Sequence, residues 1–297
     1  MRPFSIHGNS NFTFENGVSS GNGTKKNTYI IKNLDIKAKK GEDQNSYGIR
    51  IENTDSHFVI RDCYVHQYKY LYYHIAFLFT WVKEWGVHFY NVSNGMIDNC
   101  YITGTGHAIR LNNSKNNIIS NCYYDNNGCG IGVFDNSVNN IIKNCHSKNF
   151  VCGVCIYYNS SNNIIDNCSA VLSFTPVHTP FNFLRLRGFG SGWVGFYIFE
   201  KSSNNKILNC KSYSFNQNLK NRFIKRIYRE TIEGFNICRE SNNNTVKNCL
   251  SFNLPVGIRV DNLTLIKNYY GIHNIESPKN IFQNTKYIDN KIDNFIE

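Results

Sequence analysis

The feature that most constrains this chain is a recurring phrase: Asn-Asn, two mostly apolar residues, a variable residue, then Asn-Cys. Regular copies span 116–122, 139–145 and 162–168, later copies span 204–210 and 243–249, and looser ones end at Cys63 and Cys100. Counted from Cys100 to Cys168, the cysteines are 22, 23 and 23 residues apart. A fixed period of this size, holding short alternating segments and no helical pattern, is typical of a solenoid. The sequence therefore predicts an all-β fold, a parallel β-helix of about ten coils.

Each repeat contains a second phrase, Gly-apolar-x-apolar, as in 48–51, 86–89, 130–133 and 153–156. This alternation predicts a strand whose apolar residues point inward and whose variable residue points outward. The paired asparagines fall between the two strands of a coil, where Asn tolerates tight-turn geometry. We expect the second Asn of each pair to hydrogen-bond along the solenoid axis.

Seven of the eleven cysteines share one register of the repeat: Cys63, Cys100, Cys122, Cys145, Cys168, Cys210 and Cys249. Neighbouring coils lie about 4.8 Å apart, so these side chains should form one ladder. Cysteine serves well as a small apolar residue. We therefore predict a buried, reduced ladder, with Cys129, Cys152, Cys155 and Cys238 outside it.

The repeats run from about Thr28 to about Asn290, which predicts a single domain over residues 1–297 with an N-terminal cap at 1–27. Three coils are longer, with insertions at about 66–85, 171–193 and 212–232. All three enter before the Gly strand, so we expect them along one edge of the solenoid. Long loops on a rigid scaffold often carry function. The first is rich in aromatic residues, and segment 68–85 is a candidate surface for a protein partner.

The chain carries 32 Lys and Arg against 21 Asp and Glu, a net charge of +11. This favours acidic partners such as uronic-acid polysaccharides, anionic surfaces or nucleic acid. The basic residues are spread over many coils without a nucleic-acid-binding motif, so we do not expect nucleic acid. No apolar stretch approaches the roughly 18 residues of a transmembrane segment. No signal peptide precedes Arg2, so the chain is either intracellular or begins after a removed leader.

Three segments, 6–13, 48–54 and 58–65, resemble archaeal cell-surface β-helix proteins related to NosD, the periplasmic copper-binding family of the pectate-lyase-like superfamily. The resemblance implies a right-handed parallel β-helix and an extracellular or cell-surface location. The repeat is also similar to that of polygalacturonases. Segment 99–108 lacks their carboxylate pair, however, and Cys129 replaces their histidine. Inverting hydrolysis needs two placed carboxylates, so the sequence argues against that activity.

The resemblance places a ligand cleft on the face formed by the variable residues of the Gly strands. The candidate substrate-binding residues are Arg50, His88, Arg110, Tyr197, Asn236 and Arg259, with Trp81 and Trp85 in the first insertion. Arginine pairs bidentately with carboxylates, and aromatic rings pack against sugars. If the cleft is catalytic, His88, Arg110 and Tyr197 are the candidates for base and charge neutraliser. The alternative is a solvated β face that is merely basic.

His107, Cys129 and Cys152 occupy one register of three successive coils, before the Gly strand. They are candidate metal ligands, or an inward packing row, since other coils place Tyr47, Trp85 and Val194 there. We expect no cofactor.

The leading hypothesis is an extracellular protein that binds or modifies an acidic polysaccharide, as a lyase or epimerase if it is catalytic. The alternatives are a non-catalytic surface-layer or adhesin module and a NosD-like copper accessory protein.

Overall fold

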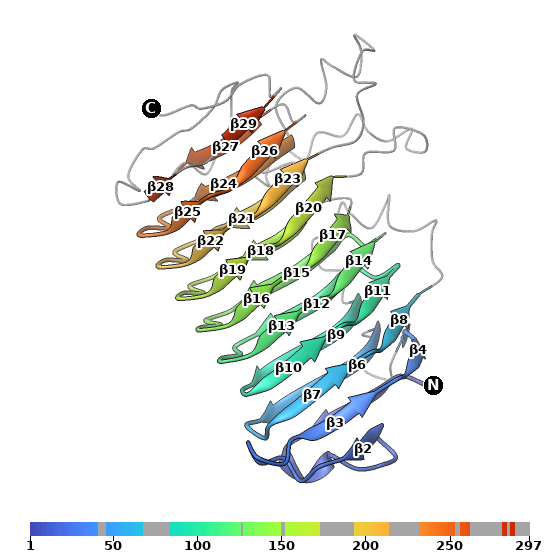
Figure 1. Ribbon diagram of the computed structural model, residues 1–297. Coiled ribbons are helices and arrows are strands. Elements are labelled where there is room, and N and C mark those ends of the chain that lie inside the picture. Colours follow the sequence, from blue (N-terminus) through green and yellow to red (C-terminus); the bar gives the residue numbers. More distant parts are fainter. Residues whose placement is uncertain are drawn as a thin grey trace.

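The computed structural model is an all-β, right-handed parallel β-helix of about eight coils, slightly fewer than the ten expected (Figure 1). The structure describes residues 1–40, 46–67, 84–125, 127–149, 152–172, 193–213, 232–252, 256–261, 281–283 and 286–288. Nearly all of the three predicted insertions, with Trp81, lies outside these ranges. Each insertion joins the end of a strand in one sheet to a strand of the next coil.

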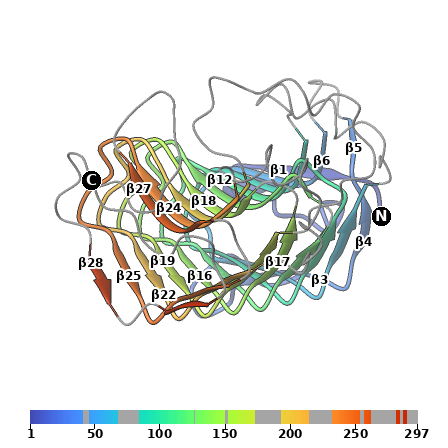
Figure 2. The same cartoon turned by 90° about the horizontal axis from the view of Figure 1, so that it is seen from above.

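Three sheets, here called A, B and C, run the length of the solenoid (Figure 2). Sheet A contains the Gly-apolar-x-apolar strands, paired in parallel except for β5, which is antiparallel to β6. Its strands are β1 (Phe4–His7), β5 (Lys39–Lys40), β6 (Ser46–Thr54), β9 (Glu84–Val92), β12 (His107–Asn112), β15 (Cys129–Phe134), β18 (Cys152–Ile156), β21 (Trp193–Ile198), β24 (Ile232–Cys238) and β27 (Val256–Asp261).

Sheet B contains the apolar residues of the Asn-Asn phrase, and only β2 pairs in the antiparallel sense, with β3. Its strands are β2 (Val18–Ser20), β3 (Tyr29–Lys32), β7 (Phe58–Arg61), β10 (Gly95–Asp98), β13 (Ile118–Ser120), β16 (Ile141–Lys143), β19 (Ile164–Asp166), β22 (Lys206–Leu208), β25 (Thr245–Lys247) and β28 (Ile281–Gln283).

Sheet C follows the cysteines and is parallel throughout. Its strands are β4 (Asp35–Lys37), β8 (Tyr64–His66), β11 (Tyr101–Thr103), β14 (Tyr123–Asp125), β17 (His146–Asn149), β20 (Ser169–Leu172), β23 (Lys211–Tyr213), β26 (Leu250–Phe252) and β29 (Lys286–Ile288). A short 3-10 helix, η1 (Asn9–Asn11), follows β1 near the N-terminal end.

The corner between sheets A and B is held by the predicted asparagine ladder. The first Asn of each pair has a left-handed backbone, with φ of 57° at Asn116, which Asn adopts more readily than most residues. The second is buried. Asn140 accepts bonds at 3.0 Å from both the backbone N and the Nδ2 of Asn117, and donates in turn to Asn163 Oδ1. A parallel ladder of serines adds backbone N–H to Oγ bonds, such as Ser114 to Ser137 at 3.0 Å.

The corner between sheets B and C explains the Asn-Cys ending. The Asn again takes a left-handed backbone, with φ of 54° at Asn121. The Cys that follows turns inward, and its thiol donates to the carbonyl two residues earlier, as from Cys122 Sγ to Ser120 O at 3.0 Å. All seven ladder cysteines are buried and free, which confirms the predicted reduced ladder.

A glycine stands at the start of most sheet A strands, with Ala108 in its place in β12, because sheet C packs closely against this position. A Cβ added at Gly48 would lie 2.3 Å from Val65 Cγ1, and one at Gly86 would lie 2.4 Å from Ile102 Cγ2. The residue after each glycine, such as Ile49, also faces the interior. Two consecutive inward residues break the strand alternation at this point, which changes the direction of every residue before the glycine.

Candidate functional site

The predicted row of outward residues is a continuous register along sheet A. Arg50 pairs with His88, and His88 with Arg110. The row then passes through Gly132 and Cys155 to Tyr197, Asn236 and Arg259. The backbone of Arg259 belongs to β27, while its side chain lies outside the description. The structure therefore confirms the alignment of the row.

The expectation that the row is exposed was wrong for His88, Tyr197 and Asn236. His88 is 4% exposed, Tyr197 2% and Asn236 1%. Trp85 is buried as well, with its ring centroid 4.1 Å from that of His88. Among the side chains of the row that the structure describes, only Arg50 and Arg110 keep intermediate exposure. The alternation of a strand sets the direction of a side chain but not whether other residues cover it.

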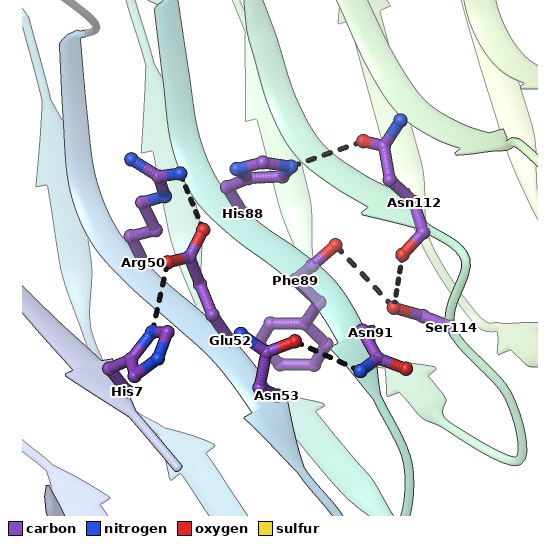
Figure 3. A network of polar contacts seen from close by, with 9 residues as sticks. All are labelled: His7, Arg50, Glu52, Asn53, His88, Phe89, Asn91, Asn112 and Ser114. Atoms are coloured by element: carbon purple, nitrogen blue, oxygen red, sulfur yellow. Dashed lines mark hydrogen bonds and ion pairs between the residues drawn. The ribbon is translucent and has the colours of Figure 1, made fainter. Parts of the chain in front are cut away.

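Near the N-terminal end, charged and amide side chains form a network on the outer face of sheet A (Figure 3). Glu52 contacts Arg50 at 2.5 Å and His7 at 3.4 Å. One coil further, Nε2 of His88 lies 3.1 Å from Oδ1 of Asn112. The network fixes the positions of these polar groups before any ligand arrives.

Arg110 is the most firmly oriented of the row. Its Nε donates to Asn112 Oδ1 at 2.7 Å, and its guanidinium carbon lies 4.3 Å from the ring centroid of Phe134. Asn112 in turn donates to Asp135. Burial lowers the pKa of Arg110, and the nearby Asp135 carboxylate offsets only part of this shift. With its Nε bonded to Asn112, the guanidinium keeps its terminal nitrogens for other partners, and their fork suits a carboxylate.

A polar hollow of about 280 Å³ adjoins this network where β6 and β9 end. It is lined by Asn9, Asn53, Thr54, Asp55, Asn91, Val92, Ser93, Asn113 and Lys115. Its volume lies just below the usual lower limit of about 300 Å³ for small-molecule sites. Asn91 Nδ2 donates to Asn53 Oδ1 at 2.9 Å, and Asn9 Nδ2 donates to Asp55 Oδ1 at 2.8 Å. Amide-rich walls of this kind suit hydroxyl groups.

Further along sheet A, the outer face is a second hydrophobic cluster. It contains Phe134, Cys152, Cys155, Val194, Tyr197, Phe199 and Cys238, with Cys129 and Tyr157 packed against it. The rings of Phe134 and Tyr157 stack at 5.0 Å. The four cysteines outside the ladder thus gather on one outward face.

The row of His107, Cys129 and Cys152 belongs to this face, so the predicted alternative of an inward packing row was wrong. The reason is the break in alternation at the glycine. Contact with Cys155 and burial raise the pKa of Cys129, and burial raises that of Cys152, which keeps both thiols protonated. The described residues contain no group of three ligands placed for a metal ion.

His107 lies against the edge of the Phe134 ring, at 5.6 Å between centroids. Its Nδ1 is buried and has no hydrogen-bond partner among the described residues. Burial, with a smaller effect of the neighbouring Arg110 and His88 charges, lowers the pKa of His107 to about 3. The residue is therefore neutral at physiological pH.

The three candidate catalytic residues do not meet. His88 and Arg110 are one strand apart and both contact Asn112. Tyr197 lies three strands beyond Arg110, about 14 Å along the axis. It packs instead against Tyr157 and Phe199, and its hydroxyl lies 3.4 Å from Cys238 Sγ.

Sequence reasoning missed a tyrosine stack on the outer face of sheet C. Tyr64 and Tyr101 stack at 5.3 Å, and Tyr101 and Tyr123 lie 5.4 Å apart. Burial and the Asp125 carboxylate raise the pKa of Tyr101 to about 12. The signal was present, because a tyrosine follows the ladder cysteine in all three coils.

The described part of the chain contains no apolar helix of membrane-spanning length.

Comparison with solved structures shows the same architecture. A glycoside hydrolase superposes with a TM-score of 0.52 at 9% identity, over 81% of this chain and 38% of its own. The surface protein and adhesin PfbA of Streptococcus pneumoniae superposes with a TM-score of 0.50 at 12% identity, over 91% of this chain and 77% of its own. An alginate lyase from Paenibacillus sp. gives 0.41 at 12% identity, over 97% and 99%.

At identities this low, the likeness shows a shared fold alone. The chain spans 47%, 38% and 31% of the first three solved structures that it matches. No curated protein is similar enough to count as a relative. Residues 3–170, more than half of the chain, match the family described as right handed beta helix region. Together with the three stacked parallel sheets, this match means that the chain belongs to the right-handed β-helix family.

Proposed function

We propose that the protein binds an anionic polysaccharide, such as a uronate polymer, on the outer face of sheet A around Arg50 and Arg110. The observation that carries the proposal is the fixed guanidinium of Arg110, held by Phe134 and Asn112. Arg50 lies two strands away, about 10 Å along the axis. Two arginines at this separation suit a chain that carries a carboxylate at regular intervals.

The polar hollow beside the network supports the same function. Its amide and hydroxyl groups offer both donors and acceptors to sugar hydroxyls, and Lys115 and Asp55 add one charge of each sign to its wall. The net charge of +11 would draw a polyanion toward the protein. Some structural neighbours that share the fold act on carbohydrates. Their substrates serve only to choose which ligands to test.

Binding is better supported than catalysis. A lyase or epimerase needs a base beside the group that neutralises the carboxylate. His88 lies one strand from Arg110 but is buried, and Tyr197 lies three strands away. A metal-delivery function, as in NosD, has less support because the described part of the chain holds no group of three side chains placed to bind a metal ion. We place the protein outside the cell or at its surface, where such polymers occur.

The proposal is tested by titrating alginate and polygalacturonate, with a neutral glucan for comparison, into the wild type and variants by calorimetry. Arg110→Ala should weaken binding of the uronate polymers by about 1–3 kcal/mol, the usual loss for a charge-assisted pair. Arg110→Lys should lose part of this because the planar fork is absent. Thermal melts would confirm that each variant is folded.

Lys211→Ala is the matched control, since it removes one exposed charge from sheet C. It should change the affinity less than twofold at physiological salt, where distant charges are screened. Equal losses in both variants would mean that polyanions are attracted by net charge alone, and the proposed site would be rejected. If ultraviolet absorbance reveals an unsaturated product in the same mixtures, the protein also has lyase activity.

A further inference from the structure

The outer face of sheet B carries a straight stripe of aliphatic residues, one per coil. Its members are Ile30, Val59, Met96, Ile118, Ile141 and Ile164, each in register with the next. All six are half-buried, while the residue after each one points into the core. A regular strip of half-exposed aliphatic groups that continues over six coils is a candidate surface for contact with another protein.

A second outward row flanks the stripe, two residues further along each strand. In the five coils from β7 to β19 it reads Arg61, Asp98, Ser120, Lys143 and Asp166. The central Ser120 is itself buried, and its hydroxyl donates to the Asp98 carboxylate. The charges in order are positive, negative, neutral, positive and negative. Reversing the order inverts every sign, so the row is complementary to itself when it is turned end for end about Ser120.

We propose that two copies of this chain pair through sheet B, with antiparallel solenoid axes, about a two-fold axis that passes through Ile118 and Ser120. An axis along the strand direction brings each row onto itself in reverse, as an isologous contact requires. Asp98 of one copy then faces Lys143 of the other, and Arg61 faces Asp166, so four opposite-charge contacts form. The inference concerns assembly and does not rest on the proposed function.

The register is specified by charge. Moving the axis half a coil toward β10 would place Arg61 opposite Lys143 but Lys32 opposite Asp166, so like and opposite charges would cancel. Moving it half a coil toward β16 would place Asp98 opposite Asp166. Like charges in such positions disfavour the wrong arrangements. In the Ser120-centred register, Met96 meets Ile141 and Val59 meets Ile164. Ile118 meets its own copy on the axis.

The size of the face sets the strength of the contact. Five coils at about 4.8 Å spacing and three-residue strands give a few hundred Å² per copy, less than the roughly 800 Å² of a standard interface. The pair should therefore dissociate on dilution, and its charges should set orientation more than affinity.

Sedimentation velocity over a concentration series tests the proposal. The 34.3 kDa chain should show reversible dimerisation. In K143E, the new carboxylate of each copy faces Asp98 of the other copy. The variant should therefore weaken dimerisation by about tenfold or more. The double variant D98K/K143E reverses both signs and should restore it. K211E makes the same charge change on sheet C and should dimerise as the wild type does.

Asp98 also accepts bonds from Ser120 and Asn121, so D98K could disturb folding. The pair R61D/D166R provides a second reversal. Asp166 likewise accepts a bond from Asn209, so circular dichroism checks the structure of both double variants. A cysteine placed on the axis by Ile118→Cys should be joined to its copy by a short bifunctional maleimide, which spans the roughly 10 Å between facing sheets, whereas Thr245→Cys, four strands along the same row, should not. A wild type that stays monomeric at every concentration, folded reversal variants that fail to regain dimerisation, or equal cross-linking at both positions would overturn the proposal.

Discussion

Sheets A and B have the same parallel register, yet their outer faces differ in kind. On sheet A, outward side chains such as Tyr197 and Cys155 are as buried as the interior and form a second hydrophobic cluster. On sheet B, outward residues such as Ile118 and Ile141 remain half-exposed beside a row of charges. An outward residue of this solenoid therefore helps to stabilise the fold on sheet A, whereas on sheet B it remains available for contact with another molecule.

The largest expected effect separates the two faces by stability. Phe134→Ala should lower the free energy of unfolding by about 3 kcal/mol, because a buried ring that stacks on Tyr157 is lost. Ile141→Ala, on sheet B, should cost less than about 1 kcal/mol because the side chain is only half-buried. Urea unfolding at low protein concentration measures both. Similar losses would show that the sheet A cluster is not a second core.

A second prediction uses pH to probe the enclosed face. The pKa of His107 is lowered to about 3 in the folded protein, against an ordinary value of 6.5. Between these values the unfolded chain binds more protons, so stability rises with pH and is lost as pH falls below 6.5. From pH 7 to pH 5 this group should cost about 2 kcal/mol.

His107→Gln should remove that part of the pH dependence in urea unfolding at pH 7 and pH 5. His146→Gln, which replaces an exposed histidine on sheet C, provides the control and should keep the wild-type slope. If both variants lose stability between pH 7 and pH 5 as the wild type does, the conclusion that His107 is enclosed is wrong.

The smallest effect lies at the border of the enclosed face. Arg239 rests on the Phe199 ring at 4.3 Å and pairs with Glu200 at 2.9 Å. Lys201 pairs with Glu240 at 3.7 Å, with both side chains largely exposed. Arg239→Gln should cost about 1 kcal/mol, and Lys201→Gln less than about 0.3 kcal/mol. Thermal melts in low and high salt would rank the two losses of stability. A larger loss for Lys201→Gln would mean that Arg239 does not mark the edge of the enclosed face.

Much of the fold could be predicted from the sequence because its signals are local and repeat. The positions of Asn117 and Cys122 follow from a period of 22 to 23 residues and from the conformations that Asn allows. The direction of Arg110 follows from alternation within one strand. Each of these inferences needs only one coil and its neighbour.

The character of the candidate site could not be predicted in the same way. Whether Tyr197 meets water depends on side chains from other coils, such as Tyr157 and Phe199, which no single repeat contains. The direction of His107 was missed because two consecutive inward residues at the strand start change the alternation. Trp81 and the side chain of Arg259, both predicted to bind substrate, lie outside the described residues and stay predictions.

The asparagine ladder has a consequence for how such a protein changes over generations. Asn117, Asn140 and Asn163 make the same bonds to the next rung, so no rung is chemically special. A segment of 23 residues can thus be duplicated or deleted in frame, and the flanking rungs will close around the change. The length of such a protein therefore changes by whole coils. Selection on the outer faces of sheets A and B decides which of these changes are kept.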